Sequence, residues 1–455
     1  MSPRYRSPGG DYLDPAEHPD GFEDPSSSGS VPRAAAFQIL VDVARGARAD
    51  EAAERRLDNL PKRARALAME LAFGCIRFRA RLDAELSELV DRPLRHVDDR
   101  AKSWLRVGLY QLRETRIPDH AAVHATVEAV QSSGRPRVAG FVNAVLRNAT
   151  RRGERSTYYP AWEFDPLGYL STYGSHPRWL VERWMARWPL ANVRALVENN
   201  NRTAPVVLRM LDPGGQDDST ADFRPVTGFA GSYVFEGGDP SGVLSRLRAV
   251  VQDPAASAVV DYIGPDIGGP VYEVCAAPGG KTLAGQAMAD SARPWISADV
   301  DRSRLDRLMV GRPAALHSGV LAVMDGRSPA VRTVRTVLLD TPCSGTGVFR
   351  RRVDARWRLT RKHLKSLVTL QSELLSACAE RVAPGGLLVY STCSLEPEEN
   401  EMQVDRFLRE HDDFHRDSPL AGMSESLLTE SGDLLVLPWT RGTDGSYAAR
   451  LRKDG

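Results

Sequence analysis

Residues 271–282, V-Y-E-V-C-A-A-P-G-G-K-T, constrain the fold of this chain more than any other segment. Val271 to Cys275 is a short, mostly apolar run, which is typical of a buried parallel strand. Small residues and Pro278 then form a turn, and a helix-compatible run begins at Lys281. A strand, a glycine turn and a helix start together offer free backbone N–H groups to a ligand at the carboxyl end of a parallel sheet. A βα turn of any doubly wound domain has a similar pattern, so the downstream sequence must decide between the two readings.

From residue 271 onward, predicted strands alternate with helices, which favours a mostly parallel sheet with helices on both faces. The later predicted strands cover residues 295–298, 320–324, 334–339 and 387–390. The first three run into Asp299, Asp325 and Asp340, at the edge where α/β sheets bind ligands. Asp299 follows the glycine turn by about twenty residues, where nucleotide-type sites place an acid that accepts hydrogen bonds from ribose hydroxyls. A single Asp after a strand is often only a helix cap, but three in register with the turn indicate a site.

Two of the five cysteines lie in loops at the same predicted edge. Cys343 lies in L-L-D-T-P-C-S-G-T-G-V, and Cys393 lies in V-Y-S-T-C-S-L-E-P-E-E-N-E. An isolated Cys is usually a small buried hydrophobe, but polar and glycine neighbours predict a functional role here. The cysteines show no CxxC pair and no His/Cys cluster at metal-ligand spacing, so no metal is expected. An odd cysteine count without a signal peptide indicates reduced thiols in the cytoplasm, and no apolar run approaches the roughly 20 residues that cross a membrane.

The length of 455 residues is too great for one ordinary core, so several domains are expected. Residues 1–30 are rich in Pro, Gly, Ser and Asp, which predicts a disordered tail. Residues 31–155 carry apolar stripes near a helical period and no convincing strand, which predicts an all-α domain. Residues 156–246 are predicted to be a connector or N-terminal subdomain of the following module, with a helix over 177–188, a turn over 199–205 and a strand over 206–210. Residues 247–455 are predicted to form the α/β domain.

The net charge of +1 gives no signal for nucleic acid, but the basic residues are unevenly chosen. Lys occurs at only six positions, so nearly all the positive charge is Arg, and much of it lies in the predicted helical domain. Arginine forks bind phosphate and stack on bases. A GC-rich genome produces the same bias, and a solvated helix face is the ordinary use of such charges, so both interpretations stay open.

Three motifs in the α/β region resemble the signature motifs of the RNA cytosine-C5 methyltransferases. They are C-A-A-P-G-G-K at 275–281, D-T-P-C-S-G-T-G at 340–347 and Y-S-T-C-S at 390–394. The helical region resembles the NusB-like RNA-binding domain of the RsmB (Sun, Fmu) branch, most closely at 106–112, 117–123 and 141–148. The resemblance implies an all-α NusB-like domain followed by an α/β, Rossmann-like, S-adenosylmethionine-dependent methyltransferase domain. It implies methylation of C5 of a cytosine in small-subunit (16S) ribosomal RNA.

The same resemblance assigns roles to individual residues. Cys393 is implied to be the nucleophile that adds to C6 of the cytosine, and Cys343 to help release the product, either as the base that removes the C5 proton or by assisting elimination. Asp340 is implied to hydrogen-bond the ring edge, and Lys281 is a candidate for activating a thiol whose ordinary pKa is about 8.5. The implied S-adenosylmethionine site consists of Cys275, Ala276, Ala277, Pro278, Gly279, Gly280 and Lys281, with Asp299 at the ribose, Asp325 on the adenine side, and Asp340. The target must be unstacked, so a single-stranded or opened loop of ribosomal RNA is the expected partner, and a monomer without metal or membrane association is expected.

Four residues depart from the family pattern. Thr341 stands where Ala is usual, beside the catalytic loop, and removes no reacting group. Arg352-Val353 replace a common His-Pro, which is expected to alter RNA contacts. Ser446 stands where an aromatic residue usually follows the glycine.

Two other classes of function fit parts of the sequence. Gly279-Gly280-Lys281-Thr282 ends like the phosphate-binding loop of a nucleotide hydrolase, but that pattern needs Gly where this chain has Cys275, and Pro278 removes a cradling N–H. A non-catalytic RNA-binding or assembly protein would use the helical domain alone, and the presence of both loop cysteines argues against it. The same chemistry on transfer RNA is a further alternative.

Overall fold

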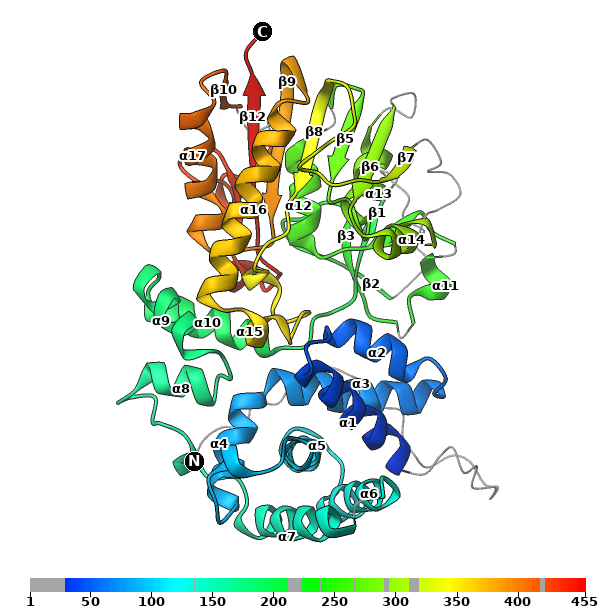
Figure 1. Ribbon diagram of the computed structural model, residues 1–455, viewed down its shortest axis with the longest axis vertical. Helices are drawn as coiled ribbons and strands as arrows, with labels where there is room; N and C mark the ends of the chain where they lie inside the picture. The colour runs from blue at the N-terminus through cyan, green and yellow to red at the C-terminus, as the bar shows by residue number, and fades with distance from the viewer. Residues whose placement is uncertain are drawn as a thin grey trace.

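The computed structural model describes residues 29–455 apart from 135, 212–221, 238, 245, 265–266, 290–293, 311–318 and 418–421. A helical N-terminal half packs against an α/β half, which lies above it in Figure 1. This arrangement confirms the predicted fold class. The predicted disordered tail lies almost wholly outside the described residues.

The N-terminal half is built from helices alone within the described range. They are α1 (Ser30–Ala44), α2 (Ala49–Leu57), α3 (Lys62–Arg77), α4 (Arg79–Leu89), α5 (Asp99–Glu114), α6 (Asp119–Ser132) and α7 (Pro136–Arg152). The rings of Phe37 and Trp104 stack 4.1 Å apart in the core. Residues 63–89 carry one continuous apolar stripe near a helical period in the sequence, but they form two helices, α3 and α4, because Phe78 leaves helical geometry between them. Sequence periodicity does not reveal this break, because both helices bury apolar residues against the same core.

The connector consists of four helices and a small antiparallel sheet. These are α8 (Pro166–Thr172), α9 (Arg178–Arg187), α10 (Leu190–Asn201), β1 (Val207–Met210), β2 (Phe223–Pro225), β3 (Ser232–Phe235), α11 (Ser241–Leu244) and β4 (Ala249–Val251), with strand order β2-β3-β1-β4. The predicted turn over 199–205 is wrong at its start, because α10 continues to Asn201. Asn199 and Asn200 are buried and bond to Thr443 O and His176 Nε2, so tertiary contacts override their low helix propensity.

The large sheet has the order β10-β12-β9-β8-β5-β6-β7, and β11 pairs with β12. Its strands are β5 (Val271–Val274), β6 (Trp295–Asp299), β7 (Gly319–Val323), β8 (Val334–Asp340), β9 (Val382–Thr392), β10 (Phe414–Arg416), β11 (Leu434–Val436) and β12 (Ser446–Lys453). The strands from β9 through β8, β5 and β6 to β7 are parallel, whereas β12 runs antiparallel to its neighbours. The five predicted strands are therefore confirmed, although β9 is longer than predicted.

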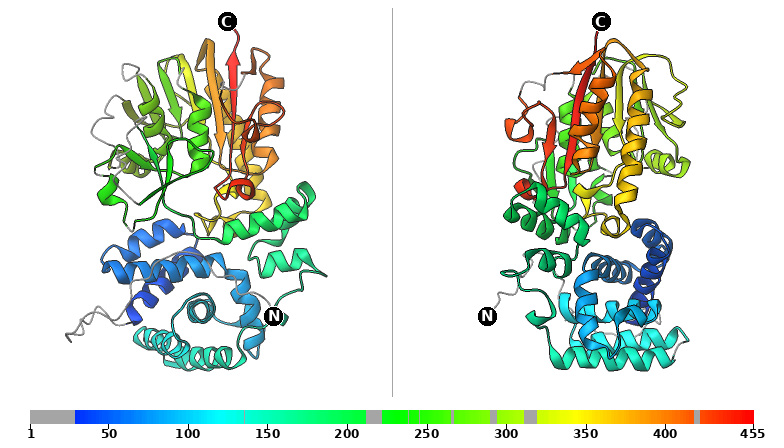
Figure 2. Two further views of the ribbon diagram at one scale, coloured as in Figure 1. Left: turned by 180° about the vertical axis from the view of Figure 1, so that it is seen from behind. Right: turned by 60° about the vertical axis from the view of Figure 1, so that its left-hand side comes forward.

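Helices cover both faces of this sheet. They are α12 (Pro254–Ile263), α13 (Gly280–Met288), α14 (Arg302–Val310), α16 (Arg361–Ala379) and α17 (Glu401–Glu410). The short helices α15 (Ala355–Arg358) and α18 (Pro438–Arg441) pack instead beside the connector helices. The helices α16 and α17 lie in front of the sheet in Figure 1, and α12 and α13 come forward when it is seen from behind in Figure 2. Of the described helices, none is long and apolar enough to span a membrane.

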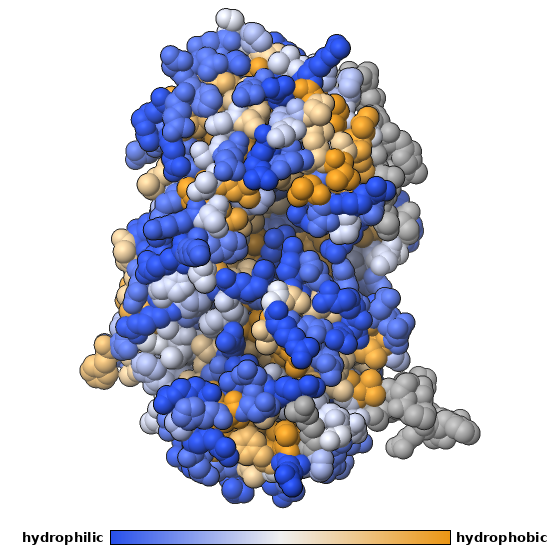
Figure 3. Space-filling model, in the orientation of Figure 1, coloured by the Kyte–Doolittle hydropathy of each residue, from blue (hydrophilic) through white to orange (hydrophobic). Residues whose placement is uncertain are grey.

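The two halves meet directly through the segment that follows the Cys343 loop. Val353 is fully buried within the core of the N-terminal helices. The indole N–H of Trp357 donates to the Ile76 carbonyl at 2.7 Å. Figure 3 shows a hollow at this junction that is bordered largely by hydrophilic side chains. The helical half therefore forms one side of the space in front of the loop.

Candidate active site

The glycine turn between β5 and α13 has a backbone that only particular residues permit. Cys275 has a φ of +59°, in the left-handed region. Gly279 has a φ of +99°, and a Cβ there would lie 2.4 Å from Leu308 Cδ1, so glycine is required. Within the described chain, the amides of Gly280 and Lys281 have no backbone acceptor, as expected in the first turn of a helix. These amides at a helix N-terminus can bind a negatively charged group.

The two loop cysteines lie together at the carboxyl end of the sheet. Cys343 and Cys393 come from the loops that follow β8 and β9, and their Sγ atoms are 3.3 Å apart. The hydrogen bond from the Cys343 thiol lowers the pKa of Cys393, and the positive charge of Arg352 lowers it further against the effect of burial. The same hydrogen bond, together with burial, raises the pKa of Cys343 well above its ordinary value. Cys393 is therefore the member of the pair that carries negative charge more readily.

Lys281 and Asp340 form an ion pair beside the thiols. Lys281 Nζ lies 2.7 Å from Asp340 Oδ2, and the Ser391 hydroxyl donates to Asp340 Oδ1 at 2.9 Å. Burial acts to lower the pKa of Lys281, but the charge of Asp340 outweighs it and the pKa rises. Lys281 is thus charged, and its closest charged partner is Asp340 rather than a thiol.

Glu399 is a site residue that the sequence analysis missed. It is fully buried, and its Oε1 accepts from the Ser344 amide at 2.8 Å and from Gln371 Nε2 at 2.9 Å. Its Oε2 accepts from the hydroxyls of Ser344 and Ser394. Ser344 and Ser394 each follow one of the loop cysteines, so this carboxylate holds the two loops at a fixed separation. The acidic run after Cys393 is the signal in the sequence, but the run alone does not show which of its carboxylates turns inward.

The predicted cofactor carboxylates occupy two different environments. Asp299 is buried and accepts a hydrogen bond from the Ala277 amide at 3.2 Å, which ties β6 to the glycine turn. The guanidinium of Arg304 lies 3.7 Å from Asp299 and donates to the Ala277 carbonyl, so it covers this carboxylate. Asp325 is partly exposed beyond β7, where a hydrogen-bonded ion pair with Arg327 lowers its pKa. Both lie at the same sheet edge as the turn, because β5, β6 and β7 are parallel neighbours.

Comparison with known proteins identifies the family. Residues 262–452 match the family model of the 16S rRNA methyltransferase RsmB/F, residues 30–151 match the NusB family, and residues 176–210 match the ferredoxin-like domain of RsmF/B-like methyltransferases. Ribosomal RNA small subunit methyltransferase B of Erwinia tasmaniensis is 33% identical over 408 residues, covering 85% of this chain and 90% of that protein. The protein of the same name from Salmonella arizonae is 32% identical, covering 86% and 90%. This chain belongs to the RsmB/F family of methyltransferases.

Solved structures agree with this fold. The crystal structure of PH0851 superposes on this RsmB/F-family chain with a TM-score of 0.75 at 21% identity, covering 93% of this chain and 99% of that one. A methyltransferase homolog protein from Pyrococcus horikoshii superposes with a TM-score of 0.53 at 23% identity, covering 63% and 98%. At these identities the likeness shows the shared fold.

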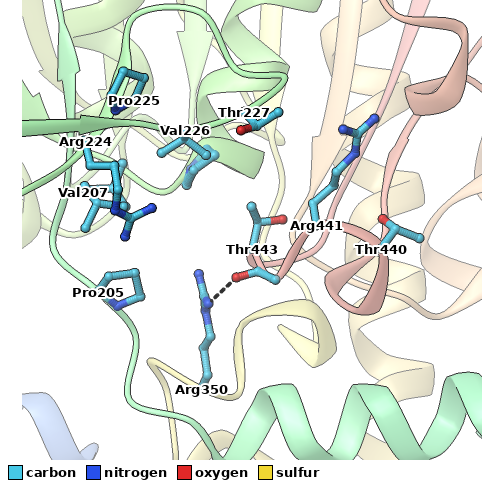
Figure 4. Close-up of a pocket in the computed structure, with 13 residues that line it drawn as sticks. Pro205, Val207, Arg224, Pro225, Val226, Thr227, Arg350, Thr440, Arg441 and Thr443 are labelled. Atoms are coloured by element: carbon cyan, nitrogen blue, oxygen red, sulfur yellow. Dashed lines mark hydrogen bonds between the residues drawn. The ribbon is translucent and has the colours of Figure 1, made fainter. Parts of the chain in front are cut away.

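A separate cavity of about 430 Å³ lies between the small sheet of the RsmB/F-family chain and α18. Arg224 and Arg350 point into it in Figure 4, and none of the predicted site residues lines it. Arg350 is buried and bonds Asp253 and Asp444 at 2.7 Å each, so it fixes the chain that follows the Cys343 loop. Of the described His, Cys, Asp and Glu residues, no group of three or more could hold a metal ion.

Proposed function

We propose that this RsmB/F-family methyltransferase transfers a methyl group from S-adenosylmethionine to C5 of a cytosine in small-subunit ribosomal RNA, through a covalent bond between Cys393 and C6 of the base. The observation that carries the proposal is the thiol pair 3.3 Å apart at the carboxyl end of the sheet. The hydrogen bond from Cys343, with a smaller effect of Arg352, lowers the pKa of its Cys393 member. A lowered pKa increases the fraction of thiolate, which is the nucleophilic form.

The residues of the glycine turn fit S-adenosylmethionine. The amides at the start of α13 can bind the carboxylate of its methionine part, and the Cβ-free Gly279 lets the backbone approach closely. Asp299 lies at the neighbouring strand end, and each oxygen of a carboxylate can accept more than one hydrogen bond, so it can serve ribose hydroxyls. Movement of Arg304 away from Asp299 would open that position. When bound, S-adenosylmethionine supplies an electrophilic methyl group on a sulfonium.

The protein residues supply the remaining chemistry. Addition of the Cys393 sulfur to C6 converts the ring into an enamine, whose electron pair at C5 takes the methyl group. Asp340 faces the site with oxygens that accept from Lys281 and Ser391. We assign its remaining acceptor capacity to the N4 amino group of the base and to the N3–H that forms when N3 takes up a proton from solvent during addition. Removal of the C5 proton then lets the C6–S bond break and returns Cys393 as a thiolate. We assign Cys343 to this last step. Its raised pKa keeps the thiol protonated in the free protein, so it acts as the base only after that proton has passed to solvent, and otherwise it assists elimination.

The position of the N-terminal half supports an RNA substrate. The cytosine must leave its stack to meet Cys393, which favours a single-stranded or opened loop. The hydrophilic hollow at the junction of the two halves offers space in front of the loops (Figure 3). We place the activity in the cytoplasm, where both thiols stay reduced. The names of the relatives favour ribosomal RNA over transfer RNA as the target.

Substitution of each thiol tests the mechanism. Cys393→Ala is expected to abolish incorporation of labelled methyl groups into ribosomal RNA, whereas Cys343→Ala is expected to trap a protein–RNA adduct that survives denaturing electrophoresis. The double variant is the control and should form no adduct. Full turnover by Cys393→Ala would refute the role given to that residue.

Bisulfite sequencing tests the substrate. Ribosomal RNA from cells that contain the protein should carry a protected cytosine that disappears when the gene is removed. Protection that changes only in transfer RNA would transfer the proposal to that substrate, and no change in either RNA would favour an assembly role.

A further inference from the structure

The two thiols of the site are close enough to react with each other. The Sγ atoms of Cys343 and Cys393 lie 3.3 Å apart, in direct hydrogen-bonding contact. The sulfurs of a disulfide lie about 2.0 Å apart, so this pair needs to approach by only about 1.3 Å to form one. Both side chains are partly exposed, whereas Cys75 and Cys378 are buried. The pair is therefore within reach of a small oxidant as well as of each other.

The surrounding chain holds the two thiols in this relation. On one side, the parallel pairing of β8 with β9 leads directly into the two loops. On the other side, Ser344 and Ser394, which follow the two cysteines, both donate to the buried carboxylate of Glu399. The amide of Gly347 also donates to the Cys393 carbonyl at 3.0 Å. Because the sulfurs are already held together, a bond within one molecule is favoured over a bond between two molecules.

The difference between the two thiols gives each a separate part in oxidation. The hydrogen bond between them lowers the pKa of Cys393 and raises that of Cys343. Burial, with the charges of Asp299 and Asp340, raises the pKa of the third partly exposed thiol, Cys275, to about 12. The thiolate is the form that peroxides oxidise, and a second thiol beside it converts the first product into a disulfide. The pair at 343 and 393 has this arrangement.

We propose that Cys343 and Cys393 form a reversible disulfide when the protein meets hydrogen peroxide, and that methyl transfer stops until a dithiol reduces this bond. The geometry of the thiol pair carries the formation of the disulfide. The loss of methyl transfer rests on the role of Cys393 as nucleophile in the proposed function, because a sulfur in a disulfide cannot add to C6 of a base. The site would thus act as a redox switch.

The oxidation takes two steps. The Cys393 thiolate attacks one oxygen of the peroxide, the O–O bond breaks, hydroxide leaves, and the cysteine becomes a sulfenic acid. The Cys343 sulfur then attacks the sulfur of this acid, the S–O bond breaks, and the oxygen leaves as water together with the proton of the Cys343 thiol. Two electrons have passed from the two sulfurs to the peroxide. A dithiol such as dithiothreitol reverses the change by thiol–disulfide exchange, and is itself oxidised to a disulfide.

The test counts and maps thiols in the full-length protein. The reduced protein is treated with a small excess of hydrogen peroxide, denatured, blocked with N-ethylmaleimide and measured by mass spectrometry. Three of the five cysteines should take up maleimide, and digestion should yield a linked pair of peptides that contain Cys343 and Cys393. Dithiothreitol should restore both the five reactive thiols and the incorporation of labelled methyl groups into ribosomal RNA.

Two variants sharpen the mass measurement. Cys343→Ala removes the second thiol and is expected to leave Cys393 as a sulfenic acid, which dimedone traps, and then as a sulfinic acid that dithiothreitol does not reduce. Cys275→Ser removes the third partly exposed thiol and is the matched control. It should still form the linked peptide pair in the wild-type yield.

Three results would overturn the proposal. They are the uptake of five maleimide groups after peroxide treatment, a linked pair that contains a different cysteine, and a bond between two protein molecules. Failure of the proposed function gives a different result. In that case the bond between Cys343 and Cys393 forms, but the oxidised protein and Cys393→Ala both retain methyl transfer, which refutes the switch and the nucleophile together.

Discussion

Removal of the Glu399 carboxylate should separate the two cysteine loops. The carboxylate is fully buried and accepts four hydrogen bonds, from the Ser344 amide and hydroxyl, the Ser394 hydroxyl and the Gln371 amide. The prediction is that Glu399→Ala loses both stability and methyl transfer, whereas Glu399→Gln loses much less of each.

The magnitude follows from the donors that remain. The Ser344 and Ser394 hydroxyls lie 3.0 Å apart and can bond each other after the substitution. The Ser344 N–H has no other acceptor, and Gln371 keeps only its bond to the Pro342 carbonyl. Two donors left without their acceptor cost about 2 kcal/mol each, so Glu399→Ala should lower the free energy of unfolding by about 4 kcal/mol. In Glu399→Gln the amide oxygen keeps the Oε1 partners and the two hydroxyls can turn to accept, so the expected loss is about 1 kcal/mol.

Urea unfolding followed by tryptophan fluorescence measures the difference, provided that the slope with denaturant stays constant among the variants. Glu398→Ala is the neighbouring control. Its carboxylate bonds Arg183 in a half-buried ion pair, and Arg183 keeps its second carboxylate partner, Glu396, after the substitution, so the expected loss is about 1 kcal/mol. A midpoint for Glu399→Ala within error of that for Glu398→Ala would refute the argument that this carboxylate holds the loops together.

Three further substitutions test other parts of the structure. Burial raises the pKa of the Glu273 carboxyl from 4.5 to about 7, so between these pH values the group is protonated in the folded state and ionised in the unfolded state. The free energy of unfolding therefore falls as pH rises from 4.5 to about 7. Glu273→Gln should remove about 3 kcal/mol of this loss at pH 8 and little at pH 5, as measured by thermal unfolding at both pH values. Gly279→Ala places a methyl group against Leu308 at a residue with a φ of +99° and should lower the free energy of unfolding by about 1–3 kcal/mol. It should also weaken S-adenosylmethionine binding measured by calorimetry, and a wild-type affinity would contradict this prediction. Trp357→Phe removes the indole donation to the Ile76 carbonyl and should lower the unfolding free energy by about 1 kcal/mol in urea, so an unchanged midpoint would show that this contact does not hold the halves together.

The parallel core of the sheet was predictable because its strands are apolar runs that end in the same edge. The antiparallel strands of the same sheet, β10, β11 and β12, were not predicted. In β12 the side chains from Ser446 to Leu451 are buried, yet the segment contains Arg450. That arginine is accommodated because it donates to the Tyr262 and Ile263 carbonyls and to Asp417, which lie far from it in the sequence. Hydrophobic patterning alone places an arginine side chain in solvent, so the buried partners of Arg450 must be known before this strand can be recognised.

The same reasoning explains which parts of the site the sequence revealed. The thiols and the glycine turn are local motifs, so their presence could be predicted, although their separation could not. The prediction of a cation for the thiol was less successful. Lys281 stands inside a motif and is therefore an obvious candidate, but in the folded chain its ammonium group is paired with Asp340 at 2.7 Å. The charges of Lys281 and Asp340 have opposite signs, so their effects on the pKa of Cys393 oppose each other. The pair therefore lowers this pKa less than an unpaired cation at the same place would. Arg352 lowers the pKa of Cys393 more than Lys281 does, and the two arginines that precede it are paired with Asp253 and Asp444.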